Sequence, residues 1–115
     1  MSKPVGPYTP AVKAGDFVFT SGQIPIIDGQ IVTGGIEIQF KQALDNLKTV
    51  IESQSASLNQ VIKTTIFVTD MSNYASINDI YINFFGDHRP ARSVVQVSAL
   101  PLEALIEIEA VLFQG

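Results

Sequence analysis

Cysteine is absent from the 115 residues, and histidine occurs only once, as His88. The absence of cysteine excludes disulfide bonds, thiolate metal ligands and a cysteine nucleophile. A single histidine also leaves too few ligands for a typical transition-metal site, so we expect no metal. A serine nucleophile is disfavoured, because His88 would have to act as its base and no motif places it beside a serine.

Charged residues are scarce, at 16% of the sequence, whereas soluble domains usually contain about a quarter. The net charge is −4, and the longest basic segment spans residues 88–92. Nucleic-acid binding normally requires a Lys/Arg cluster that displaces counterions from phosphates, so a nucleic-acid partner is disfavoured. A small protein with few charges also has difficulty covering its surface, which favours an oligomer that buries apolar faces.

Long hydrophobic runs are missing as well. No apolar segment approaches the roughly 20 residues of a membrane span, and the first seven residues lack the apolar core of a signal peptide. We therefore expect no membrane association and a cytoplasmic protein, unless a transit peptide has been removed. The length fits one domain, residues 1–115.

The spacing of apolar and β-branched residues predicts the order β-β-α-β-α-β-β. The predicted elements are strands 11–13 and 17–20, a helix 36–53, a strand 61–69, a helix 74–85, and strands 93–99 and 106–113. Pro25 should end strand pairing after the first hairpin, and Asp28-Gly29 should form a turn. Each helix lies between strands, so this is an α+β fold with a mixed sheet and both helices on one face.

The second face of the sheet is expected to be covered too, because neither side of strand 61–69 is cleanly polar. One predicted side carries Ile62, Thr64, Ile66 and Val68, and the other carries Val61, Lys63, Thr65 and Phe67. Two helices can cover only one face. A second subunit is the natural cover for the other face, which favours a symmetric oligomer.

Arg92 is the first candidate for a functional residue. It enters an apolar strand two residues after Pro90, and an arginine in such a place suits bidentate binding of a carboxylate or phosphate. Taken alone, a structural ion pair or a solvated arginine explains it better, because one arginine is weak evidence.

Two further places carry polar groups of interest. Glu107 and Glu109 should share one face of the last strand, where a carboxylate could orient or activate water, although a solvated face is the simpler explanation. Ser21 and Gly22 follow the first hairpin, where a glycine permits close approach of a ligand to the backbone. A simple turn would explain the same residues.

These pieces together resemble the RidA family, also called the YjgF or L-PSP family, over nearly the whole chain. The matching segments are Gly6-Pro7-Tyr8, Thr20 to Pro25, Gln42 to Leu47, Val61 to Asp70, Pro90-Ala91-Arg92-Ser93 and Ile106 to Ala110. The resemblance implies a chorismate-mutase-like α+β fold and a homotrimer with pockets in the clefts between subunits. It also implies hydrolysis of reactive 2-imino acids, or their enamine tautomers, to 2-oxo acids and ammonia. These intermediates come from pyridoxal-phosphate-dependent dehydratases, and the hydrolase itself uses no cofactor or metal.

The resemblance also implies roles for individual residues. Arg92 would bind the substrate carboxylate, and Glu107 would position the attacking water. The remaining pocket residues would be Tyr8, Ser21, Gly22, Asn78 in the second helix, and the backbone of Val94 beside the imine nitrogen. Many relatives have cysteine where this chain has Val94, so thiol chemistry is excluded there.

Other functions stay open from the sequence. The loop 86–89 is shorter than in many relatives and places Arg89 near Arg92, where it would either favour dicarboxylates or face solvent or another subunit. A non-catalytic metabolite-binding trimer would use the same pocket without turnover. RNA cleavage or inhibition of translation, attributed to some family members, is disfavoured by the acidic balance and the lack of a basic patch.

Overall fold

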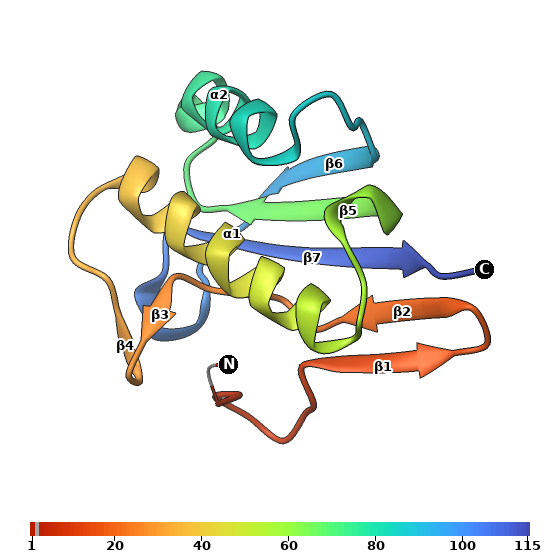
Figure 1. Cartoon of the computed structure of the whole chain (residues 1–115). Helices are drawn as coiled ribbons and strands as arrows, with labels where there is room; N and C mark the ends of the chain where they lie inside the picture. Colours follow the sequence, from red (N-terminus) through yellow and green to blue (C-terminus); the bar gives the residue numbers. More distant parts are fainter. Residues whose placement is uncertain (2) are drawn as a thin grey trace.

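A computed structural model describes residue 1 and residues 3–115. Its centre is a five-stranded sheet in the order β1-β2-β7-β5-β6 (Figure 1). The strands are β1 Ala11–Ala14, β2 Phe17–Thr20, β5 Val61–Val68, β6 Ala91–Gln96 and β7 Ile106–Phe113. The β5 and β6 strands are parallel and the other neighbours are antiparallel, so the sheet is mixed, as predicted.

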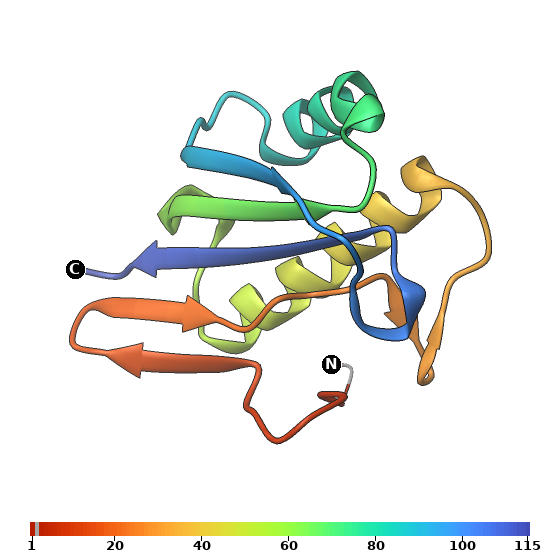
Figure 2. The same cartoon turned by 180° about the vertical axis from the view of Figure 1, so that it is seen from behind.

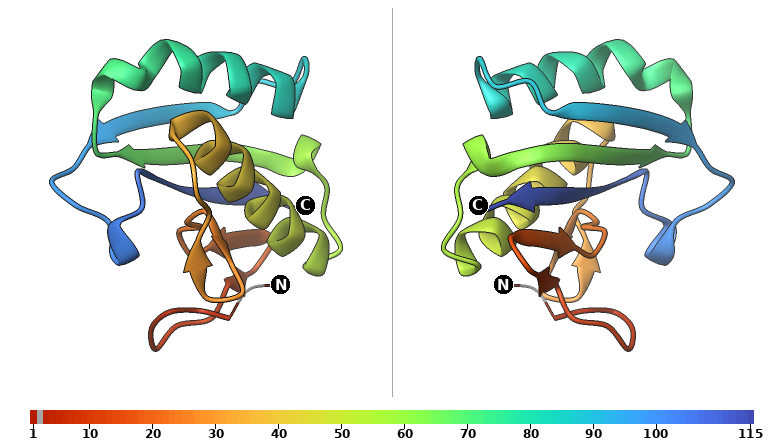
Figure 3. Two further views of the ribbon diagram at one scale, coloured as in Figure 1. Left: turned by 90° about the vertical axis from the view of Figure 1, so that its left-hand side faces the viewer. Right: turned by 90° about the vertical axis from the view of Figure 1, so that its right-hand side faces the viewer.

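Two helices pack on one face of this sheet. They are α1 Ile36–Ser53 and α2 Tyr74–Phe85, with the boundaries predicted from the sequence. The view from behind shows the sheet in front of α1 (Figure 2), and the side views show α2 running along β6 (Figure 3). The α+β prediction is therefore confirmed. In the described part of the chain, no helix is both long and apolar enough to cross a membrane.

The core lies between the helices and the sheet because β7 alternates strictly. Ile106, Ile108 and Leu112 are fully buried toward the helices, whereas Glu107 and Glu109 are half-buried on the other face. The main apolar partners from the helices are Phe40, Leu44, Leu47, Ile51, Ile77 and Phe85. The predicted separation of the two glutamates from their apolar neighbours is thus confirmed.

The predicted faces of β5 are wrong at its first two residues. A bulge lies between Val61 and Lys63 in the pairing with β7, so the alternation changes there. Val61 is consequently buried in the core, and Ile62 is 43% exposed. From Lys63 to Val68 the alternation is as predicted.

Both boundaries of β6 also differ from the predicted strand 93–99, whereas β1 and β5 differ from their predicted ends by one residue. The β6 strand begins at Ala91, which pairs with Lys63, and ends at Gln96 rather than at residue 99. It stops there because Gln96 pairs with Val68, the last residue of β5. A short 3₁₀ helix, η3 Pro101–Glu103, then leads to β7.

Two elements of two residues each escaped the sequence prediction. These are β3 Ile26–Ile27 and β4 Gln30–Ile31, which form a separate small hairpin. The predicted turn at Asp28-Gly29 joins them, and both residues have positive φ, as this turn requires. Asn46 on α1 holds the segment from Ile24 into β3 in place, since its Nδ2 donates to the carbonyls of Ile24 and Ile26 at 2.9 and 3.0 Å.

Two short 3₁₀ helices flank β5, namely η1 Leu58–Gln60 and η2 Met71–Asn73. The side chain of Asp70 accepts a hydrogen bond from the backbone N–H of Ser72 at the start of η2. Because η2 continues directly into α2, the Asp70 cap fixes the residue at which this helical segment begins. Gly86, with φ 64°, ends α2.

The burial pattern of α1 gives a test of the packing. Leu44→Ala should lower the free energy of unfolding by about 2–5 kcal/mol, because Leu44 is buried and the change leaves a cavity. Ile38→Ala is the matched control on the same helix, since Ile38 is 54% exposed, and it should change stability by no more than about 0.5 kcal/mol. Chemical denaturation at fixed protein concentration measures both, and equal losses would contradict the packing.

Candidate functional site

Arg92 lies on the edge strand β6, and its side chain contacts α2. Its Nη2 donates a hydrogen bond of 3.0 Å to the hydroxyl of Tyr74. The guanidinium carbon lies 5.5 Å from the ring centroid of Tyr74 and 4.9 Å from that of Tyr81, within the range of cation–π attraction. Cation–π contacts do not pair the guanidinium with a negative charge, so they orient Arg92 and leave its positive charge for a ligand.

Tyr81 is the more rigidly held of the two tyrosines that contact Arg92. It is 5% exposed, and its hydroxyl shares a hydrogen bond of 2.7 Å with Thr64 of β5. Burial raises the pKa of Tyr81, and the hydrogen bond to Thr64 and the nearby arginine charges offset this only partly. The phenol therefore stays protonated beside Arg92.

Asn78 and Val94 complete the group around Arg92. Asn78 lies one helical turn after Tyr74, and its Oδ1 is buried without a hydrogen-bond partner among the described residues. The side chain of Val94 packs on the core. Because the N–H of Val97 bonds to β5, alternation directs the N–H of Val94 toward the open edge of the sheet. We call Arg92, Tyr74, Asn78, Tyr81 and Val94 the arginine cluster.

Glu107 lies in a second group, which is built around β7. Gln23 forms an isolated antiparallel bridge with Ile108, with hydrogen bonds of 2.7 and 3.0 Å. This bridge holds Gly22 against Glu107, and a Cβ atom at Gly22 would collide with the Glu107 carboxylate. The group that approaches the Gly22 backbone in this chain is therefore the Glu107 carboxylate, whereas the sequence predicted the approach of a ligand.

Tyr8 and Ser21 lie in the same group. Together with Val5, Gly22, Pro101 and Glu107 they line an open cavity of about 480 Å³. The Ser21 hydroxyl donates to the carbonyl of Thr9, so only its acceptor lone pairs remain for a ligand. The Tyr8 hydroxyl accepts from the N–H of Val5 at 3.3 Å, which leaves its own proton to donate. We call Tyr8, Ser21, Gly22 and Glu107 the glutamate cluster.

The environment of Glu107 changes its acidity. Burial raises the pKa of Glu107, and the negative charge of Glu109 raises it further. A carboxyl with a raised pKa is a stronger base when it is ionised, and it holds a proton up to a higher pH than an exposed glutamate does. Among the carboxyl groups of the glutamate cluster and its strand, this one has the environment expected of a proton-transfer group.

The two clusters lie on opposite faces of one sheet. Thr64 of β5 pairs with Ala110 of β7 and with Arg92 of β6, so these three side chains share one face. Phe67 of β5 pairs in the same way with Glu107 and Val95, which share the other face. Thr64 is buried under the helices, whereas Glu107 lies on the face without helices. A small ligand that touched Arg92 could not touch Glu107 of the same chain, so the structure does not bring the two predicted catalytic residues together within one subunit.

The other candidates from the sequence have local roles. The Nε2 atom of His88 lies 2.7 Å from the carbonyl oxygen of Val61, which ties the loop after α2 to the start of β5. Arg89 donates to the carbonyls of Gly86 and His88, so its exposed side chain is bound to its own loop.

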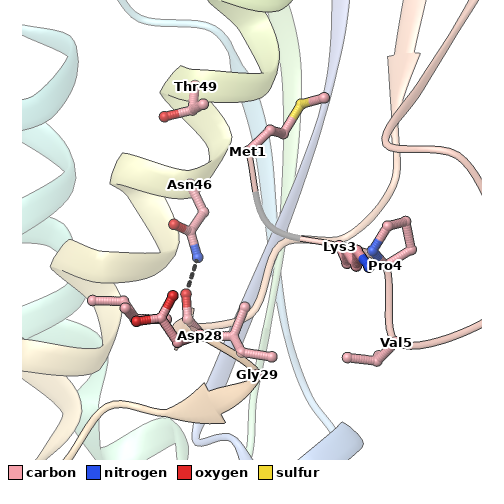
Figure 4. A pocket seen from close by; sticks show the side chains of 10 residues that line it. Met1, Lys3, Pro4, Val5, Asp28, Gly29, Asn46 and Thr49 are labelled. Carbon is pink, nitrogen blue, oxygen red and sulfur yellow. Dashed lines mark hydrogen bonds between the residues drawn. The ribbon is translucent and has the colours of Figure 1, made fainter.

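A larger cavity, of about 720 Å³, lies beside the cavity of the glutamate cluster and shares Val5 with it. It is formed by the N-terminal segment, the β3–β4 hairpin and α1, and includes Lys3, Asp28, Asn46 and Thr49 (Figure 4). None of the residues predicted from the sequence as site residues lines it. In the described residues, no three His, Asp or Glu side chains gather as a metal site.

The sequence prediction missed Tyr74 and Tyr81 as neighbours of Arg92. The ring of Tyr81 is buried against the core, whereas Tyr74 is 43% exposed. Their i, i+7 spacing places both on one face of α2, but the sequence does not reveal that Arg92 lies between them.

Comparison with known proteins decides the family. A sequence model described as Endoribonuclease L-PSP matches residues 1–114. The chain belongs to this family, the RidA or YjgF/L-PSP family.

Relatives within the RidA family match this chain over most of their own length. A RutC family protein of Pyrococcus horikoshii is 48% identical, covering 97% of this chain and 90% of the relative. The mouse 2-iminobutanoate/2-iminopropanoate deaminase is 39% identical, covering 96% and 84%. The crystal structure of Escherichia coli TdcF with bound serine is 38% identical, with a TM-score of 0.91 over 97% of this chain and 91% of TdcF. The fold is thus the chorismate-mutase-like fold that the resemblance implied.

The raised pKa of Glu107 predicts a pH-dependent stability. A glutamate in the unfolded chain ionises near its ordinary pKa of 4.5. The stability from the protonated folded form is therefore fully present below about pH 4.5 and is lost as pH rises through the raised folded pKa. Glu107→Gln cannot ionise, so it should raise the melting temperature at about pH 7, with a gain that disappears near pH 4.

Thermal unfolding at the two pH values measures this effect. The same substitution at the exposed Glu52 of α1 controls for the general loss of one negative charge. A Glu107→Gln protein that melts lower than the unmodified chain at neutral pH would contradict the environment assigned to Glu107.

Proposed function

We propose that this protein hydrolyses reactive 2-imino acids, or their enamine tautomers, to 2-oxo acids and ammonia. The proposed site lies in the cleft between subunits of a homotrimer, with the arginine cluster from one subunit and the glutamate cluster from its neighbour. Two relatives support this reaction by name, the mouse deaminase and TdcF of Escherichia coli, named as a reactive intermediate deaminase, at 39% and 40% identity.

The observation that carries the proposal is the separation of Arg92 from Glu107. Each cluster is incomplete alone, since one offers a cation and the other a carboxylate with a raised pKa. They lie on opposite faces of one chain, so a second copy is needed to bring both to one small molecule. A closed ring of subunits would repeat this contact at each interface.

The face without helices supports such an assembly. It carries large apolar side chains that are exposed in the single chain, including Phe17, Phe19, Val95 and Phe113, each at least 40% exposed. Exposed aromatic side chains on one sheet face are typical of a surface that another subunit covers. Their burial would bring the glutamate cluster of one subunit against a neighbouring chain.

The arginine cluster fits the carboxylate end of the substrate. A guanidinium held between two neutral aromatic rings keeps its charge and its orientation, which suits bidentate binding of a carboxylate. Asn78 Oδ1 is a buried acceptor that lacks a donor, and such an atom normally has a partner. The N–H of an imine or enamine is one group that would satisfy it, and the backbone of Val94 would lie beside the same nitrogen.

The glutamate cluster fits the delivery of water. Ionised Glu107 accepts a proton from water as the water oxygen bonds to the imine carbon, and it passes this proton to the nitrogen, which receives the electron pair of the C=N π bond. Glu107 then takes the hydroxyl proton of the carbinolamine and gives it to the nitrogen, so that the C–N bond breaks, ammonia leaves and the C=O bond of the 2-oxo acid forms. The imine carbon is already electrophilic, so orientation and one proton-transfer group suffice, and the reaction as proposed uses no cofactor.

Two other functions are weaker candidates. A metabolite-binding regulator would need Arg92 but would have no use for a carboxylate with a raised pKa. RNA cleavage, which the description of the family suggests, would place polyanionic RNA on a chain with 7 Lys and Arg against 11 Asp and Glu.

Ammonia release from 2-iminobutanoate, generated by a dehydratase in a coupled assay, tests the proposal. The protein should accelerate release, and Arg92→Ala should lower kcat/KM by about 100-fold or more while the oligomer stays intact. Arg89→Ala is the matched control, because Arg89 is bound to its own loop, and it should change kcat/KM less than about 2-fold. Equal activity of Arg92→Ala and the unmodified protein would exclude the proposed site.

A parallel assay separates the alternatives. Tight binding of 2-oxobutanoate without any acceleration of ammonia release would favour the regulator. Cleavage of RNA that disappears in Arg92→Ala would favour the nuclease, whereas cleavage that persists in this variant would indicate contamination.

A further inference from the structure

Tyr74 stands at the open side of the guanidinium of Arg92. Tyr81 closes the other side, since it is 5% exposed and tied to Thr64, whereas Tyr74 is 43% exposed. A ligand that reaches Arg92 from solvent therefore passes Tyr74 rather than Tyr81.

The hydrogen-bond geometry leaves the Tyr74 hydroxyl with a proton to donate. Arg92 has no acceptor atoms, so in the bond of 3.0 Å it must be the donor, and the phenol oxygen must be the acceptor. The phenol proton then points away from the guanidinium. It lies next to a cation, where an anion is favoured, and it has no acceptor in the bonds formed among the described residues.

We propose that Tyr74 is a binding residue of the anion site, whose hydroxyl donates to the ligand carboxylate that Arg92 binds, and that it thereby selects for carboxylate-bearing substrates. This proposal rests on the proposed function, because it assigns a third donor to the same carboxylate. It adds specificity, since a planar carboxylate presents two oxygens, and donors from two side chains fix its rotation as well as its position.

The ring and the hydroxyl of Tyr74 have separable roles. The ring supports the guanidinium through the cation–π contact, with 5.5 Å between the guanidinium carbon and the ring centroid. Tyr74→Phe keeps this ring and removes only the hydroxyl. Because the side chain is exposed, the substitution leaves no buried polar group without a partner, and the fold should be unchanged.

Isothermal titration with two ligands tests the hydroxyl. The ligands are 2-oxobutanoate, the product of the proposed reaction, and 2-oxobutanamide, its neutral analogue of nearly equal shape. Tyr74→Phe should weaken 2-oxobutanoate binding by about 10-fold, as expected for a lost hydrogen bond to a charged group, and should leave 2-oxobutanamide binding unchanged. In turnover, KM should rise with little change in kcat, because the carboxylate does not change during the reaction.

A crystal structure of the unmodified protein with 2-oxobutanoate separates direct contact from an effect through Arg92. The proposal expects the Tyr74 hydroxyl within about 3 Å of a carboxylate oxygen. A hydroxyl that contacts Arg92 alone would overturn it.

The remaining outcomes distinguish this proposal from the proposed function. Binding of 2-oxobutanoate that depends on Arg92 but is equal in Tyr74→Phe would overturn the role of Tyr74 and leave the deaminase intact. An equal loss for both ligands would also overturn it, because Tyr74 would then shape the pocket rather than bind the carboxylate. Failure of the unmodified protein to bind 2-oxobutanoate would overturn both.

Discussion

The alternation of side chains across the sheet is the constraint on which the rest of the structure depends. Arg92 is paired through Thr64 with Ala110, so it shares the helix face with the core. Glu107 is displaced from Ala110 by an odd number of residues, so it must point to the other face. The same alternation that buries Ile106 and Ile108 therefore separates the two reactive groups, and a site that unites them has to be built from two chains.

Function and stability conflict in the glutamate cluster. Glu107 is half-buried beside Glu109. Its carboxylate lies so close to the Gly22 backbone that position 22 has no space for a side chain. Replacing Glu107 by an uncharged residue would relieve the cost of burying its charge, yet it would remove the proposed base. In the arginine cluster the charge is accommodated differently, by two aromatic rings that attract a cation without neutralising it. Both arrangements keep reactive groups available at some expense to the single chain, as is common in functional sites.

Most of the fold could be predicted from the sequence, because α1, α2 and β7 each have a clear period. The bulge after Val61 could not, since it depends on how β5 pairs with β7, and it moved Ile62 to the exposed face. The β3–β4 hairpin was too short to give a pattern beyond its Asp28-Gly29 turn. Arg92 and Glu107 were found through motifs of the family, but their opposite faces follow from the strand register, which no local motif contains. The contact of Tyr74 with Arg92 was not predicted, because it joins residues that are 18 apart in sequence.

Mixing two inactive variants tests the shared site most directly. Arg92→Ala and Glu107→Gln chains, co-expressed in equal amounts with different tags, should form mixed trimers in which some interfaces keep both native residues. Random mixing in a closed ring of three predicts about a quarter of the unmodified ammonia-release activity, although each variant alone is inactive. If the mixed trimers are as inactive as the separate variants, Arg92 and Glu107 do not act together across a subunit boundary, and the account is wrong.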